Sequence, residues 1–199
     1  KPAASAAGSV AEGVALLRNL AGEWEGNIQT RNPDGTTSSS IVSASNRVEK
    51  DGKALASVYE GFAFGKSTDG ALALSVHTTG ALAAAFSRDG QSLTSTASVA
   101  NNAMAASFDK PLTGFKGVKV EQSLKMTDAN HYTLELVSVD AKGHKTVALK
   151  LDMTRLDAGQ KSAAAQNFEA SKSLALARSA AESVDVDGGA VQTAGVETP

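Results

Sequence analysis

The chain has 199 residues, enough for one ordinary domain with short appendages and a core that needs no disulfides or metals. Its 19 basic and 21 acidic residues give a net charge of -2, which excludes the strongly basic surface of proteins that bind nucleic acid. The lack of cysteine excludes disulfides, thiol catalysis and thiolate zinc sites.

The chain opens with KPAASAAGS, a stretch of small residues without an initiator methionine. Such a stretch is typical of a mature end left after removal of a signal peptide, or simply of a trimmed end. We expect an exported protein, periplasmic or secreted. Because no apolar run approaches the roughly 18 residues that a membrane span requires, we expect no membrane span.

Residues 1–22 are predicted to form an N-terminal segment with one short helix. In VAEGVALLRNL, residues 10–20, the apolar side chains recur every three or four residues, which is the period of an amphipathic helix. Gly13 weakens this helix, so we expect it to depend on packing against the rest of the chain.

From residue 23 to residue 156 the apolar period is two, which predicts a β domain. In EWEGNIQTR, Trp24 and Ile28 share one face of a strand, and the turn residues NPDG follow at 32–35. Similar breaks recur down to residue 140, including STDG at 67–70 and DKPLTG at 109–114. They separate runs of about seven to twelve residues, which predicts about ten strands.

The alternation is sharpest in the last three runs, in which one face is apolar and the other polar. The side chains expected to face inward are Val118, Val120, Leu124, Met126, Tyr132, Leu134, Leu136, Val147, Leu149, Leu151, Met153 and Arg155. Ten antiparallel strands with one apolar face each must close into a barrel or fold over as a sandwich. The lack of long crossovers favours an all-β, up-and-down antiparallel barrel.

Beyond the predicted barrel, residues 157–183 are rich in helix-forming residues, and Asp157 with Gln160 fits a capping box. The predicted helix has a thin apolar stripe that includes Ala164, Phe168 and Leu174, which could pack on the barrel wall or on a partner. Residues 184–199, VDVDGGAVQTAGVETP, are predicted to form a flexible tail.

A short helix, then Gly22-x-Trp24, then about ten antiparallel strands that end on an inward-facing Arg155, resembles the lipocalin-like (calycin-type) barrels. Residues 16–156 carry the likeness. LAGEWEG and the closing pair HYTLELVSVDAKGHKTVALKLDMTRL are most similar to a group of small, often exported bacterial domains of unknown function, related in shape to the haem-binding nitrobindins.

The resemblance implies that Trp24 lies across one end of the barrel and that Arg155 stacks over it. Closing a barrel makes the first and last strands neighbours, and both residues are expected to face inward. The two side chains can therefore stack in a cation–π contact. The alternative is that Arg155 emerges into solvent at the strand end. Gly22 is expected to let the chain turn from the helix into the first strand.

The nitrobindin likeness raises haem as a cofactor, because nitrobindins hold haem through one histidine of a late strand. Counted back from Arg155, the corresponding position lies near Ala148, and His77, His131 and His144 are out of phase or in turns. We therefore expect no cofactor and no metal. No Gly-x-Ser-x-Gly elbow is present, so we expect no enzyme.

The small residues of the middle strands predict either a cavity or a flattened barrel. One hypothesis is therefore a non-catalytic barrel that binds a small apolar ligand. The candidate ligand-binding residues, which are otherwise plain core, are Leu124, Met126, Tyr132, Leu134, Leu149, Leu151 and Met153. The alternative is an accessory subunit that docks on a protein partner through its barrel surface and residues 157–199.

Overall fold

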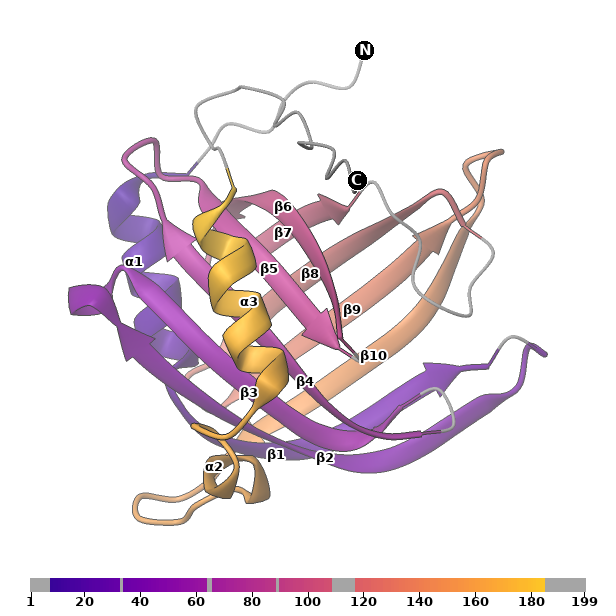
Figure 1. The fold of residues 1–199 in the computed structure, drawn as a ribbon, viewed down its shortest axis with the longest axis horizontal. Helices are drawn as coiled ribbons and strands as arrows, with labels where there is room; N and C mark the ends of the chain where they lie inside the picture. Colours follow the sequence, from indigo (N-terminus) through magenta and orange to yellow (C-terminus); the bar gives the residue numbers. More distant parts are fainter. Residues whose placement is uncertain (1–7, 33, 64–65, 89, 109–116, 185–199) are drawn as a thin grey trace, which may run out of the picture.

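Ten strands follow one another in the computed structural model, which describes residues 8–32, 34–63, 66–88, 90–108 and 117–184. They are β1 (Gly22–Arg31), β2 (Thr37–Glu49), β3 (Ala54–Ala63), β4 (Lys66–Val76), β5 (Leu82–Arg88), β6 (Gln91–Ala100), β7 (Ala103–Phe108), β8 (Lys119–Asp128), β9 (His131–Val139) and β10 (Lys145–Arg155). Each strand pairs antiparallel with its neighbours in sequence, and β1 pairs with β10 (Figure 1). The predicted ten-stranded up-and-down barrel is confirmed.

Tight turns allow this topology. At the β6–β7 turn, Asn101 and Asn102 have φ values of 52° and 58°, the left-handed conformation that a two-residue hairpin requires and that asparagine tolerates well. Pro33 of the predicted NPDG turn and the predicted turn at 109–114 lie outside the described residues.

Helix α1 (Val10–Leu20) precedes the barrel, as the sequence predicts. It begins with a capping box, in which the Ser9 hydroxyl accepts from the Glu12 backbone N–H and the Glu12 carboxylate accepts from the Ser9 backbone N–H. Leu16, Leu17 and Leu20 are almost completely buried in the same apolar cluster as the barrel interior. The helix therefore covers one end of the barrel.

The segment predicted as one helix over 157–183 forms two helices instead, α2 (Ala163–Gln166) and α3 (Lys172–Glu182). The prediction failed because Ser162 and Ser171 cap new helix starts, and their hydroxyls accept from the N–H groups of Ala165 and Leu174. Asp157 forms a turn with Gln160 rather than a helix start. Of the predicted tail, only Val184 lies within the described residues.

The C-terminal helices pack on the outer wall of the barrel, where α3 crosses β3, β4, β5 and β6 (Figure 1). Small side chains on β3–β5 let the helix approach closely. The resulting second apolar cluster contains Ala56, Val58, Ala71, Ala73, Ala85, Ala164, Phe168, Leu174, Ala177 and Ala181. The apolar stripe of the helix is thus buried on its own barrel.

Charged side chains border this cluster. Arg47 lies over the Phe168 ring, 3.8 Å from its centroid, and also pairs with Glu169 at 2.7 Å. Arg178 of α3 pairs with Glu49 of β2. These contacts join Phe168, Glu169 and α3 to β2.

Three details of the strands differ from the predicted pattern. Residues 67–70, read as a turn, lie inside β4, where Asp69 pairs with Glu60 of β3, because the β3–β4 pairing extends to Lys66. In β10 the register shifts between Val147 and Leu149, so Val147 is 46% exposed while Ala148 is buried. Val118, also expected inside, precedes β8 and is 54% exposed.

Candidate functional site

The two barrel ends differ, and α1 covers one of them. At this closed end, Trp24 of β1 pairs with Arg155 of β10, and the Arg155 guanidinium lies 4.2 Å from the centroid of the Trp24 ring. Trp24 is fully buried, and its ring meets the Tyr132 ring edge to face, with centroids 4.7 Å apart. These rings fill the closed end.

Arg155 also binds the C-terminal end of α1. Its Nη2 donates to the Asn19 carbonyl at 2.6 Å, its Nη1 donates to the Ala21 carbonyl, and its Nε donates to the Ala129 carbonyl at 3.0 Å. The last carbonyls of a helix lack partners within the helix, and they favour a cation. Arg155 therefore joins α1, the β8–β9 turn and β10.

The Leu20 carbonyl, at the same helix end, has two donors from the barrel. Trp24 Nε1 and Asn46 Nδ2 each donate to it at 2.9 Å. Asn46 Oδ1 in turn accepts from the Ser57 hydroxyl at 2.5 Å. The Trp24 indole N–H, the Asn46 amide and the Ser57 hydroxyl are thus paired. The Tyr132 hydroxyl in the same region has no hydrogen-bond partner among the described residues.

Gly22 leaves space for this arrangement. Its φ is +132°, and a Cβ at this position would lie 2.5 Å from Arg155 Nη1. Any larger residue at position 22 would displace the guanidinium from the helix end.

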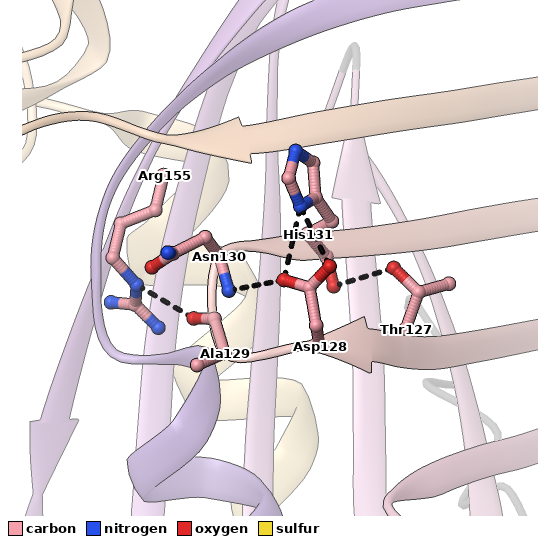
Figure 2. A network of polar contacts seen from close by, with 6 residues as sticks. All are labelled: Thr127, Asp128, Ala129, Asn130, His131 and Arg155. Carbon is pink, nitrogen blue, oxygen red and sulfur yellow. Dashed lines mark hydrogen bonds and ion pairs between the residues drawn. The ribbon is translucent and has the colours of Figure 1, made fainter.

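The turn between β8 and β9 belongs to the same end (Figure 2). Asp128 accepts from the Asn130 backbone N–H at 2.7 Å and from His131 Nδ1, and Thr127 donates to the His131 carbonyl. The Asn130 N–H, followed by His131, lowers the pKa of Asp128 below its usual value. His131 is therefore a surface partner of Asp128 and points away from the barrel interior.

At the opposite end, which we call the open end because no helix of the described residues covers it, the barrel contains a cavity of about 50 Å3. Strands β1–β5 and β8–β10 contribute to its walls, which are mostly apolar. The lining residues are Ile28, Val42, Tyr59, Gly61, Gly70, Leu72, Phe86, Arg88, Gln122, Leu134, Leu136, Leu149 and Leu151.

Three of the seven predicted ligand-binding residues line the cavity: Leu134, Leu149 and Leu151. The other four, Leu124, Met126, Tyr132 and Met153, are buried in the core and do not line it. Met126 and Met153 pair with Tyr132 on either side, which places them at the closed end. All seven side chains share the inward phase, so alternation along the strands does not separate the two groups.

Three polar side chains line the cavity that sequence reasoning missed: Tyr59, Arg88 and Gln122. Gln122 is 2% exposed, and no donor among the described residues reaches its Oε1. Burial raises the pKa of Tyr59, so its hydroxyl stays protonated near neutral pH. The inward phase shared by Val120, Gln122 and Leu124 was a usable sequence signal for Gln122.

An ion-pair cluster lies on the outer wall near the same end. Glu121 binds Lys145 at 2.6 Å and Lys119 at 3.0 Å, and these bonds lower the pKa of Glu121, with Lys145 the larger cause. The stabilisation is therefore present above the ordinary value of 4.5 and is lost as the pH falls through the lower folded value.

We expect Glu121→Gln to lower the free energy of unfolding at neutral pH by about 0.5 kcal/mol, a small effect because the pair is partly exposed. The difference from wild type should be smaller at about pH 3, below the ordinary pKa of 4.5, because protonation of the carboxylate removes the ion pairs. Urea titrations of both proteins at neutral pH and at the low pH measure the difference in the free energy of unfolding. An equal difference at both would contradict the electrostatic origin.

None of the three histidines lines the cavity, and His131 and His144 each pair with a nearby aspartate. Within the described ranges, no group of three metal-ligating side chains occurs. Among the same residues, no helix is long and apolar enough to cross a membrane.

No family model matches the sequence, and no curated protein matches it. Among solved structures, the chain is similar to Rv2717c from M. tuberculosis, with a TM-score of 0.54 and 14% identity over 73% of this chain and 98% of that one.

Two further solved structures give lower scores. An S-type phycobiliprotein lyase, CPES from Guillardia theta, has a TM-score of 0.37 and 7% identity, over 73% of this chain and 93% of that one. A protein of unknown function from the DUF3598 family of Nostoc punctiforme has a TM-score of 0.28 and 9% identity, over 72% of this chain and 99% of that one. At such identities likeness shows the fold alone: the chain is a closed ten-stranded antiparallel barrel of lipocalin-like type.

Proposed function

We propose that the protein binds a small apolar ligand in the cavity at the open end and catalyses no reaction on it. The single observation that carries this proposal is the contrast between the two ends. Buried aromatic and methionine side chains fill the closed end, whereas eight strands leave an apolar cavity at the other. Concave, mostly apolar sites with a few polar groups are typical of ligand sites.

The volume of the cavity limits what enters it. A cavity of about 150 Å3 holds benzene, and the cavity here is about 50 Å3. The part of the ligand that enters the barrel is therefore a short aliphatic group. The rest of the ligand lies toward the open end.

The polar residues of the cavity support a non-catalytic role. Near neutral pH, Arg88 and Gln122 neither release nor take up a proton, and the raised pKa of Tyr59 keeps that hydroxyl protonated. We propose that the chain shares the barrel of the nitrobindins but does not bind haem. His77, His131 and His144 do not line the cavity. Docking through α3 has less support, since its apolar face packs on its own barrel.

Xenon and 1-octanol test the proposal by methyl NMR, since both are neutral and xenon is small. We expect the methyl signals of Leu134, Leu149 and Leu151 to shift, whereas those of Leu16 and Leu124 stay unchanged. Shifts at the closed end alone, or none with either probe, would refute the cavity as a ligand site.

A filled cavity provides the matched variant. A Cβ on Gly70 would lie 3.7 Å from the Phe86 ring, an ordinary contact, so Gly70→Val is expected to fold and to occupy cavity space. The valine takes the place of about two methylenes of ligand, so 1-octanol should bind about tenfold more weakly. Ala105→Val, an exposed position of β7, is the control and should bind 1-octanol like wild type.

A further inference from the structure

One buried amide of the barrel interior has a polar atom without a partner. Gln122 of β8 is 2% exposed, and its Oε1 meets no donor among the described residues. Its side chain lines the cavity at the open end. An unpaired buried polar atom lowers stability, so an unpaired acceptor on a cavity wall points to a ligand that carries a hydrogen-bond donor.

The strand register places Gln122 beside the apolar part of the cavity. Gln122 pairs with Leu136 of β9, and Leu136 pairs with Leu149 of β10. The next inward pair toward the closed end is Leu134 with Leu151. All four leucines line the cavity together with Gln122. A short aliphatic chain next to Leu134 and Leu151 therefore brings the group that follows it level with Gln122.

The chemistry of the Gln122 side chain favours a neutral partner. Arg88 lines the same cavity but already has an interaction of its own, whereas Gln122 Oε1 has no donor among the described residues. Rotation about the last bond of an amide exchanges the positions of its oxygen and its NH2 group. A ligand group that has a donor and an acceptor side by side can pair with the amide in either orientation. A primary amide is such a group, because one N–H and the C=O lie on the same edge.

We propose that the ligand carries a neutral primary amide on a short aliphatic chain. Its amide exchanges hydrogen bonds with the Gln122 side chain, and its chain lies against Leu134 and Leu151. This inference rests on the proposed function and adds the chemical class of the ligand to it.

Two probes of equal shape test the inference. Pentanamide and 2-hexanone differ only in the NH2 group of the first, which is a methyl group in the second. Both are titrated into the full chain, with methyl NMR as the readout, and into Gln122→Met, which is similar in volume but has no amide. Water binds an amide more strongly than a ketone, so the comparison is the ratio of the two affinities in each protein, from which this difference cancels.

Gln122→Met should weaken pentanamide about tenfold and leave 2-hexanone within about twofold of wild type. The same variant should raise the urea midpoint of the unliganded protein, because it removes an unpaired buried acceptor. Gln29→Met, at an exposed position of β1, is the matched control and should change neither the affinities nor the midpoint. An equal ratio in wild type and Gln122→Met, or a lower urea midpoint for Gln122→Met, would overturn the inference.

A wild-type measurement keeps the test independent of the folding of the variant. In the complex with pentanamide, the NH2 protons of the probe should give nuclear Overhauser effects to the methyl groups of Leu136, the residue opposite Gln122. Bound pentanamide without these effects would refute the position of the amide. If xenon and 1-octanol bind but the amide preference is absent, the apolar site stands. If no probe binds, the proposed function itself fails.

Discussion

Trp24→Ala is expected to lower the free energy of unfolding by about 3 to 5 kcal/mol, the range for removing a large aromatic side chain from a core. Trp24 is fully buried and contacts three parts of the closed end: the Tyr132 ring, the Arg155 guanidinium and the Leu20 carbonyl. Alanine would remove all three contacts and leave a void under α1. Denaturant titration followed by far-UV circular dichroism measures the loss.

Ile41→Ala on the neighbouring strand β2 is the control, because Ile41 is 70% exposed and should change stability by less than about 0.5 kcal/mol. A loss below about 1 kcal/mol for Trp24→Ala would contradict the closing role of the tryptophan. Trp24→Phe separates the contributions, since it keeps an aromatic ring but loses the hydrogen bond from Nε1 to the Leu20 carbonyl.

Phe168→Ala is expected to have the second largest effect, a loss of about 3 kcal/mol. Phe168 is 1% exposed, belongs to the apolar cluster shared by α3 and strands β3–β5, and has Arg47 over its ring. Its removal should loosen α3 from β4 and β5 before the barrel itself unfolds. Hydrogen exchange should therefore speed up for the α3 amides more than for those of β8 and β9.

Leu176→Ala, on the same helix but 41% exposed, is the matched control and should leave this exchange nearly unchanged. If Phe168→Ala and Leu176→Ala gave the same hydrogen exchange in α3, the second apolar cluster would not be what holds α3 on the barrel.

The architecture was predictable because local signals agreed with one another. Period-two alternation and frequent turn residues indicate strands, and the placement of Trp24 and Arg155 indicates which strands close the barrel. In β10, however, the bulge turns Val147 outward and Ala148 inward. A bulge depends on pairing with β9, which alternation within one strand does not report.

The candidate site was only partly predictable for a similar reason. Alternation placed Leu134 and Met126 on the same inward face, but only the assembled barrel shows that Leu134 reaches the cavity while Met126 packs at the closed end. Arg88 and Gln122 come from strands that are not paired with each other. Their convergence on one cavity follows from barrel closure, which no short stretch of sequence encodes.

The pairing of β1 with β10 also sets the order in which the chain can fold. Trp24 meets Arg155 only after every intervening strand has been made, so the ladder that closes the barrel cannot form early during synthesis. Hairpins such as β8–β9 need only neighbouring residues and can form first. Because Trp24 is the single tryptophan of the chain and pairs with β10, its fluorescence should be sensitive to this closure.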